Sequence, residues 1–147
     1  MIRLSNFEEV HKIWTSHLWP QRENVAHMTS MTYLGGHDTE IYAKYKPTFF
    51  VYEIKGEIVG VNSCCKSATT QMRSRGLWVN TRYRRQGITY KLFNALFEEA
   101  NIQECELVWS LPRKTAIKAY LANGFEKTSD WIKTDTSSAN CYAVKML

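Results

Sequence analysis

The sequence predicts an α/β protein in which helices cover both faces of a central mixed β-sheet. Strand-like runs rich in Val, Ile, Phe and Tyr recur along the chain, and some are joined by short turns, which give antiparallel neighbours. Two other connections contain segments with helical periodicity, and such strand–helix–strand crossovers give parallel neighbours. The 147 residues, 44% of them hydrophobic, are enough for one core, so we expect a single domain over residues 1–147.

The N-terminal part is expected to be mainly helical. After an apolar lead-in at residues 2–4, Ser5 and Glu8 have the spacing of a capping box, with Ser5 as the N-cap. A second helix is predicted over residues 22–33, and a turn-rich loop over residues 34–38. The first helix should begin at the capping box, because apolar and aromatic side chains then recur at helical spacing: Phe7, Val10, Ile13, Trp14 and His17.

A β-hairpin is predicted in the middle of the chain. Residues 48–55 and 58–68 are rich in aromatic and β-branched residues, and Gly56 lies between them, so the two strands should pair antiparallel. A polar stretch over residues 67–74 is expected to turn the chain into a shorter strand over residues 76–80.

The C-terminal half alternates helices and strands. A helix is predicted over residues 89–101, and a strand over residues 104–111 follows it. Pro112 suits the first turn of another helix, which should end at Gly124 because glycine readily adopts the left-handed conformation of a C′ residue. Two strands close the chain, over residues 125–128 and 140–147.

The charge distribution points to an anionic ligand. The net charge is +5, and no Asp or Glu occurs between Ile58 and Phe97. A basic turn over residues 82–89 connects a strand to a helix, where unpaired N–H groups at a helix start bind anions and arginine suits phosphate oxygens. We therefore expect a phosphate or pyrophosphate at this turn. The basic residues of the segment are Lys66, Arg73, Arg75, Arg82, Arg84, Arg85 and Lys91.

Cysteine usage and the N-terminus favour a cytoplasmic protein. The four cysteines have neither CxxC nor metal-ligand spacing, so we expect buried reduced thiols and no metal. The first residues lack a basic region followed by an apolar run, and no segment approaches about 18 continuous apolar residues, so no membrane association is expected. The cysteines are Cys64, Cys65, Cys105 and Cys141.

Two motifs resemble those of the GNAT superfamily of acyl-CoA-dependent N-acyltransferases. The strand–loop–helix motif of the family, roughly V-x-P-x-Y-R-G-x-G-I-G, is similar to residues 79–89, and its core maps onto Arg84, Gly87 and Thr89. The second motif, Ala-x-x-x-Tyr-x-x-x-Gly-Phe, maps onto Ala116, Tyr120, Gly124 and Phe125. With the order of elements, the resemblance covers essentially the whole chain, and it implies a GNAT-like fold.

This sequence departs from the family pattern at three positions. Thr81 stands where Pro is common, Arg113 where Asn is common, and Thr89 where a small Gly or Ala is usual. Thr89 either crowds the pyrophosphate or donates its hydroxyl to it. Arg113 would add a cation near the same ligand.

The resemblance implies acetyl-CoA, or another acyl-CoA, as co-substrate. Its pantetheine would run beside Val79, with the backbone donors of Trp78 and Val79 free to pair with it and to polarise the thioester. The pyrophosphate would be held by the N–H groups of Arg84, Arg85, Gln86, Gly87, Ile88 and Thr89.

Catalytic candidates follow from the needs of N-acylation. Tyr120 matches the usual general acid of the family, which protonates the departing thiolate, although the same residue also fits an apolar packing stripe. Residues 76–80 contain no carboxylate, so Glu53, Ser110 or a water chain remain candidates for the base. Asp38 and Glu40, among aromatic residues, could bind a cationic amine, or they are solvated loop charges.

The expected function is an N-acetyltransferase that moves an acetyl group from acetyl-CoA directly to a primary amine of a small molecule or a protein. No residue presents itself as an activated nucleophile for a covalent intermediate. One alternative is a non-catalytic acyl-CoA-binding module. A lower-ranked alternative is a basic nucleic-acid-binding domain. A monomer and a homodimer both fit the sequence, and the acyl-chain preference stays open.

Overall fold

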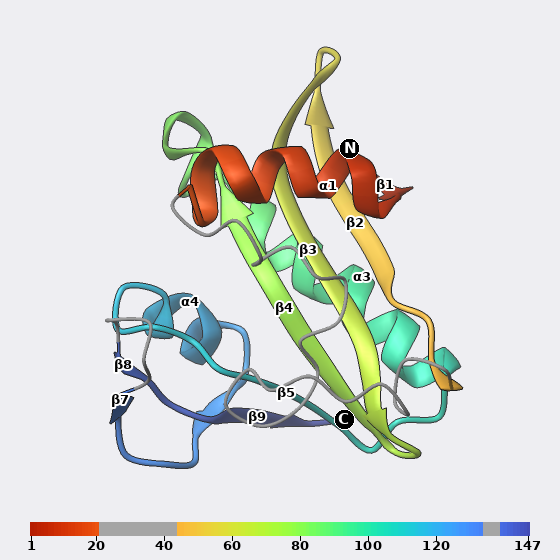
Figure 1. Ribbon diagram of the computed structural model, residues 1–147, viewed down its shortest axis with the longest axis vertical. Coiled ribbons are helices and arrows are strands. Elements are labelled where there is room, and N and C mark those ends of the chain that lie inside the picture. The colour runs from red at the N-terminus through yellow and green to blue at the C-terminus, as the bar shows by residue number, and fades with distance from the viewer. Residues whose placement is uncertain (21–43, 134–138) are drawn as a thin grey trace.

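A mixed β-sheet forms the centre of the molecule (Figure 1). The computed structural model describes residues 1–20, 44–133 and 139–147. In this part of the chain the sheet has seven strands in the order β1-β2-β3-β4-β5-β9-β6. Its strands are β1 (Ile2–Ser5), β2 (Thr48–Ile54), β3 (Glu57–Ala68), β4 (Gln71–Val79), β5 (Leu107–Ser110), β6 (Glu126–Lys127) and β9 (Ala143–Met146).

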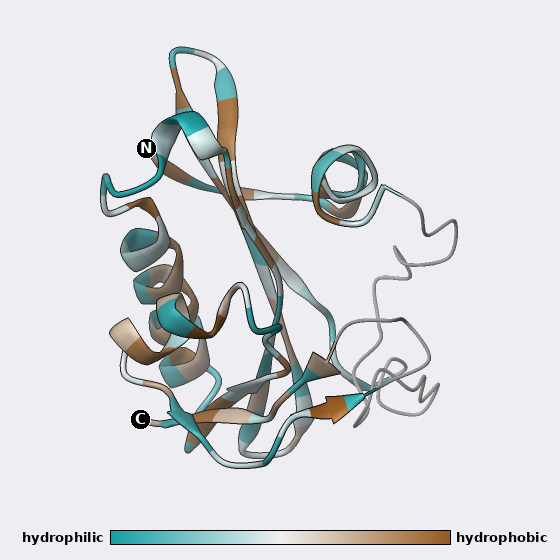
Figure 2. Cartoon of the chain, turned by 90° about the vertical axis from the view of Figure 1, so that its left-hand side faces the viewer, coloured by the Kyte–Doolittle hydropathy of each residue, from teal (hydrophilic) through white to brown (hydrophobic). Residues whose placement is uncertain are grey.

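The predicted fold class is confirmed. Strands β4 and β5 are parallel, and the other neighbouring strands are antiparallel, so the sheet is mixed. Helix α1 (Phe7–Ile13) lies on one face and helix α3 (Ile88–Ile102) on the other (Figure 2). Helix α4 (Ile117–Ala122) packs on the α3 face, where the Tyr120 ring lies 5.1 Å from the Phe93 ring. None of the described helices is long and apolar enough to cross a membrane.

The start of the first helix differs from the prediction. Asn6, not Ser5, is the N-cap, and its Oδ1 accepts the Glu9 N–H at 2.9 Å. Ser5 cannot take this role, because it is the last residue of β1 and its backbone pairs with Phe49. The helix continues beyond α1 as a π-helical segment, Trp14–Leu18. The predicted helix at 22–33 and loop at 34–38 lie outside the described residues.

Strand β4 is longer than predicted, and the prediction of a polar connection over residues 67–74 was wrong. The connection between β3 and β4 is only Thr69-Thr70. The polar residues Arg73, Ser74 and Arg75 belong to β4 and are buried. Their polarity is accommodated by contacts between strands and with tryptophan rings, which a local sequence pattern does not reveal.

The C-terminal elements follow the predicted order, but some boundaries differ and two short strands are added. Pro112 does not begin a helix, because α4 starts only at Ile117. Gly124 has a φ of 90°, as expected for a residue that ends α4 in the left-handed region. The predicted last strand is divided into β8 (Ala139–Asn140), which pairs with β7 (Ile132–Lys133), and β9.

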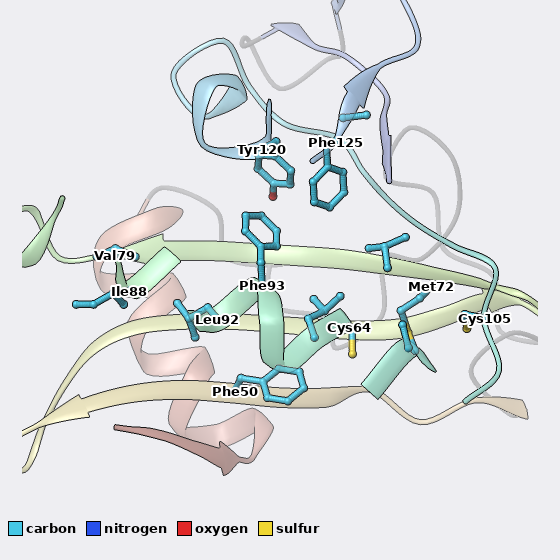
Figure 3. Close-up of a cluster of buried hydrophobic side chains, with 14 of the residues drawn as sticks. Phe50, Cys64, Met72, Val79, Ile88, Leu92, Phe93, Cys105, Tyr120 and Phe125 are labelled. Atoms are coloured by element: carbon cyan, nitrogen blue, oxygen red, sulfur yellow. The ribbon is translucent and has the colours of Figure 1, made fainter. Parts of the chain in front are cut away.

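Two hydrophobic clusters lie on the two faces of the sheet. The larger one joins α3 and α4 to the sheet, and Phe93 lies at its centre, in ring contact with Tyr120 and Phe125 (Figure 3). The smaller cluster joins α1 to the other face through Val10 and Trp14. Because both faces are covered, the central strands are fixed from two sides.

A β-bulge in β4 depends on Trp14. The register between β3 and β4 shifts between the pairs Ser63–Arg75 and Val61–Trp78, so β4 has two residues opposite one. Gly76, at the bulge, has a φ of 81°, and its carbonyl accepts the indole N–H of Trp14 at 2.9 Å. A Cβ at Gly76 would lie 2.3 Å from the Trp14 ring. Gly76 is therefore required both for its conformation and for space.

Gly76→Ala should lower the free energy of unfolding by about 3 kcal/mol, because it combines left-handed backbone strain with a clash in a packed core. Gly56→Ala is the matched control. Gly56 has a φ of 82°, but a Cβ there would meet no atom within 4 Å. Gly56→Ala should lower the free energy of unfolding by about 1 kcal/mol, from backbone strain alone. Urea denaturation measures both, and equal losses would show that the Trp14 contact has no energetic weight.

Candidate functional site

Strands β4 and β5 separate to leave a gap. Their parallel pairing covers residues 71–73 of β4 and 107–109 of β5, after which the strands diverge (Figure 1). At the far end of β4, the Asn80 N–H donates to the Val59 carbonyl at 2.8 Å. Since backbone groups alternate along an antiparallel strand, the Val79 N–H points away from β3 and into the gap, whereas that of Trp78 points toward β3.

Asn80 shapes the turn at the open end of the gap. Its side-chain oxygen accepts the Arg82 N–H at 3.0 Å, and its carbonyl accepts the Tyr83 N–H at 2.9 Å, which closes the 3₁₀ turn Thr81–Tyr83. Arg84 then donates from Nε to the Val79 carbonyl at 3.4 Å. The side chain of Arg84 is thereby tied to the strand that borders the gap.

The start of α3 offers backbone donors to an anion. The first bond within the helix runs from the Lys91 N–H to the Gly87 carbonyl at 3.1 Å, so the N–H groups of residues 88–90 have no acceptor within the helix. Gly87, the N-cap, has a φ of 77°, and a Cβ there would meet no atom within 4 Å. The backbone is thus open to a close approach by a phosphate group.

The predicted pyrophosphate residues occupy this one turn. Arg84, Arg85 and Gln86 are exposed, so their charged and polar groups can face a ligand. Ile88 is buried and anchors the helix start in the core, while Thr89 is half-buried in the first turn. The turn fits a diphosphate in charge and in backbone geometry. Arg113 follows β5, and its backbone forms a bridge with Asn140.

Tyr120 lies at the narrow end of the gap. Its ring makes edge contacts with Phe93 and Phe125, each at 5.1 Å between centroids (Figure 3). Its Oη lies 3.3 Å from Ser110 Oγ, and Ser110 Oγ donates to the Ser74 carbonyl at 2.7 Å. Burial raises the pKa of Tyr120. The phenol therefore stays protonated at neutral pH.

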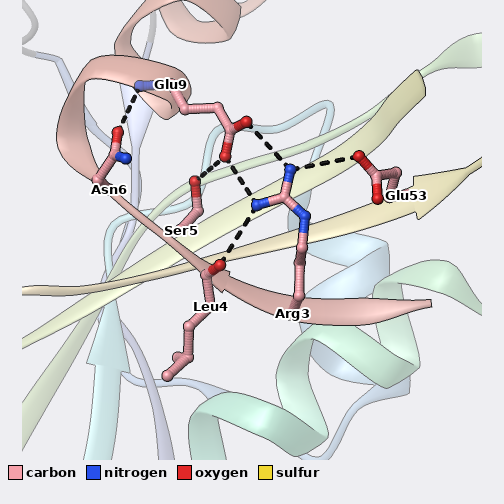
Figure 4. A network of polar contacts seen from close by, with 6 residues as sticks. All are labelled: Arg3, Leu4, Ser5, Asn6, Glu9 and Glu53. Atoms are coloured by element: carbon pink, nitrogen blue, oxygen red, sulfur yellow. Dashed lines mark hydrogen bonds and ion pairs between the residues drawn. The ribbon is translucent and has the colours of Figure 1, made fainter. Parts of the chain in front are cut away.

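Glu53 is not brought together with Tyr120. It lies on β2, which β3 and β4 separate from β5. Its carboxylate pairs with Arg3 at 3.3 Å, and Arg3 also binds Glu9 at 2.9 Å (Figure 4). Arg3, together with Ser5, lowers the pKa of Glu9. Asp38 and Glu40 lie outside the described residues.

The face of β4 that carries α1 is aromatic and cationic. The Arg75 guanidinium lies 5.2 Å from the Trp14 ring and 5.0 Å from the Trp19 ring. The His17 ring stacks on Trp78, with 4.7 Å between centroids. Aromatic residues were predicted to be near the acceptor, but Arg75 was not included, because it was grouped with the basic residues expected to favour an anionic ligand. Arg75 is buried against tryptophan rings that are distant in the sequence, so the local sequence does not reveal its burial.

The cysteines do not form a reactive site. All four are free and buried, and burial raises the pKa of each thiol, to about 11 for Cys65. Thiolates, not thiols, are nucleophiles, so these residues are unreactive near neutral pH. Within residues 1–20, 44–133 and 139–147, no group of His, Cys, Asp or Glu side chains is arranged to hold a metal ion.

Tyr120→Phe should change the pH dependence of stability. In the unfolded wild type the phenol ionises near pH 10, whereas the folded state, with its raised pKa, keeps the proton. The resulting stabilisation is present below about pH 10 and is lost as the pH rises toward the folded-state pKa. Urea denaturation should show a steeper fall in the free energy of unfolding above this pH for the wild type than for Tyr120→Phe.

Tyr90→Phe is the control for this measurement. Tyr90 is an exposed residue of α3, so its loss should leave the slope of the wild type unchanged. Identical slopes for the wild type and Tyr120→Phe would contradict the influence of burial on Tyr120.

Comparisons with solved structures show relatives of the same fold. An IAA acetyltransferase from Bacillus cereus ATCC 14579 has a TM-score of 0.74 at 14% identity, with 100% of this chain and 99% of the other covered. A GNAT family acetyltransferase from Elizabethkingia anophelis with acetyl-CoA bound has a TM-score of 0.59 at 12% identity, with 74% and 80% covered. An aminoglycoside 6'-N-acetyltransferase in complex with coenzyme A has a TM-score of 0.74 at 10% identity, with 99% and 96% covered.

The sequence comparison identifies the family. No curated protein matches the chain. The family model described as an acetyltransferase (GNAT) domain matches residues 46–127, which include the turn at the start of α3 and Tyr120. This match spans more than half of the 147 residues. The chain belongs to the GNAT acetyltransferase family.

Proposed function

We propose that the protein transfers an acetyl group from acetyl-CoA directly to a primary amine of a small molecule or a protein. One arrangement supports this function above all. The gap between β4 and β5 has an anion-binding turn at its open end and the protonated phenol of Tyr120 at its narrow end. A thioester that carries a diphosphate could occupy both ends at once.

The turn and strand β4 would hold the coenzyme. The N–H groups at the start of α3, with Arg84 and Arg85, would bind the pyrophosphate. The N–H of Val79 would pair with a pantetheine amide. Acetyl-CoA supplies the acyl group in activated form, as a thioester. Structures of two similar proteins contain coenzyme A or acetyl-CoA, which supports the same ligand here.

Tyr120 would supply the proton for the leaving group. When the amine nitrogen bonds to the carbonyl carbon and the C–S bond breaks, sulfur needs a proton and nitrogen must lose one. The Tyr120 phenol is protonated and lies at the narrow end of the gap, so it can donate to sulfur. The nitrogen proton passes to solvent, and Tyr120 regains a proton from solvent, so the overall reaction neither consumes nor releases a proton. The raised pKa values of the thiols favour direct transfer over an acyl-cysteine intermediate.

A non-catalytic acyl-CoA-binding module is the second candidate. It is favoured by the position of Glu53, which is paired with Arg3 on the far side of β3 and leaves the base unassigned. Binding of nucleic acid is disfavoured, because Arg73 and Arg75 are each only 7% exposed and cannot reach backbone phosphates from their positions in β4.

Turnover with a panel of amines separates the two candidates. Polyamines, amino acids, aminoglycosides and peptides are incubated with acetyl-CoA, and the free thiol released is measured. An enzyme should acetylate at least one amine, and Tyr120→Phe should lower kcat about 100-fold while coenzyme A still binds. Binding of coenzyme A without acetylation of any amine would favour the non-catalytic module.

Arg84→Ala and Arg85→Ala should each weaken the binding of coenzyme A about tenfold, because each removes a charge-assisted contact to phosphate. Titration calorimetry at constant salt measures the affinity. Lys12→Ala is the control, since it removes the same charge from an exposed position on α1. It should leave the affinity within about twofold of the wild type. Equal effects of all three variants would show that net charge, not the turn, governs binding.

A further inference from the structure

A chain of buried polar side chains crosses the α3 face of the sheet beside Tyr120. Asn62 and Ser74 are 0% exposed, and Ser110 and Tyr120 are 4% exposed. They come from β3, β4, β5 and α4, and they border a cluster that is otherwise apolar. Such groups are costly in a core unless they bond to one another, so their arrangement restricts where each proton lies.

Ser110 takes the place of a backbone bond at the point where β4 and β5 separate. The last residue pair of the parallel ladder is Arg73–Trp109, so the next would be Ser74–Ser110. Instead of a further backbone pair, the Ser110 side chain donates to the Ser74 carbonyl at 2.7 Å. The hydroxyl thus joins the strands where the gap begins.

This bond determines how Ser110 faces Tyr120. A serine hydroxyl has one proton, and a carbonyl can only accept, so the proton of Ser110 is committed to Ser74. At 3.3 Å from Tyr120 Oη, Ser110 Oγ therefore offers a lone pair. The phenol proton can point at this lone pair. The long distance makes the bond weak, so the proton is easily redirected.

Asn62, at the far end of this set of buried polar side chains, is also held by hydrogen bonds. Asn62 Nδ2 donates to Ser74 Oγ at 3.1 Å, and Asn62 Oδ1 accepts the Ser63 N–H at 2.9 Å. These bonds hold the β4 residue whose carbonyl receives the Ser110 proton. In contrast, Phe93 and Phe125 fix the ring of Tyr120 but contribute no hydrogen bond to its hydroxyl.

We propose that Ser110 is a positioning residue for Tyr120. Ser110 joins β4 to β5 at the narrow end of the gap, and it keeps the phenol proton of Tyr120 oriented there until a leaving sulfur accepts this proton. The inference rests on the proposed function, in which Tyr120 is the proton donor. Ser110 itself neither gives nor takes a proton in the reaction. It acts through the orientation of the Tyr120 O–H bond.

Ser110→Ala is compared with Ser63→Ala, a closely matched control. Ser63 Oγ also donates to a β4 carbonyl, that of Arg75, at 2.7 Å, and Ser63 is 1% exposed. The two variants thus lose the same type of bond to the same strand, but only Ser110 contacts Tyr120. Ser110→Cys is a second variant, in which a weak and somewhat larger thiol donor replaces the hydroxyl.

The first measurement does not depend on turnover. In protein labelled with ¹³C at the tyrosine ζ carbon, the signal of Tyr120 is the one missing from Tyr120→Phe. Ser110→Ala and Ser110→Cys should shift this signal at neutral pH, because the hydrogen bond of the phenol changes, and Ser63→Ala should not. A signal that stays in place in both Ser110 variants would overturn the inference, whether or not the protein proves to be an enzyme.

The second measurement uses the best amine found in the panel. Ser110→Ala should lower kcat about tenfold and leave the KM for acetyl-CoA within about twofold, since only the orientation of the proton donor changes. In the Tyr120→Phe background the same substitution should have no further effect on kcat. An equal loss of kcat in both backgrounds, or an equal loss in Ser63→Ala, would show that Ser110 has only a structural role.

Discussion

The early end of the pairing between β4 and β5 is the constraint on which the site depends. Three residue pairs join these strands, and the hydroxyl of Ser110 then closes the ladder. Because β4 continues to Val79 without this neighbour, a backbone N–H faces the gap. The same divergence leaves room at its narrow end for the phenol of Tyr120 from α4. The proposed coenzyme binding and the proposed proton donation would thus both originate in one irregularity of the sheet.

Features determined by local chemistry could be predicted from the sequence. The hairpin of β2 and β3, the turn before α3 and the end of α4 at Gly124 each depend on residues close together in the chain. The predictions were wrong where residues distant in the sequence determine the local structure. Ser5 was assigned as a cap, although its backbone belongs to a strand pair with Phe49. The polarity of Arg73 and Ser74 suggested a connection, although partners from other elements bury both.

The same distinction applies to the candidate site. The turn at residues 84–89 and the buried Tyr120 belong to contiguous motifs, so their places were accessible from the sequence. Asn62 and Ser74 were missed, because a polar residue within a strand gives no sign of the partner that it meets across the sheet. Glu53 was considered as a base from its residue type alone. Its neighbour Arg3, 50 positions away, determines its actual role in an ion pair.

The contact between Trp14 and Gly76 also constrains which substitutions this protein can accept during evolution. The indole N–H of Trp14 donates to the Gly76 carbonyl, and the Trp14 ring fills the space that a Cβ at position 76 would need. The two positions, 62 apart in the chain, therefore depend on each other. A larger residue at position 76 becomes acceptable only after the tryptophan has been replaced by something smaller. Proteins that keep this packing should therefore show covariation at the two positions, with glycine retained wherever the tryptophan is present.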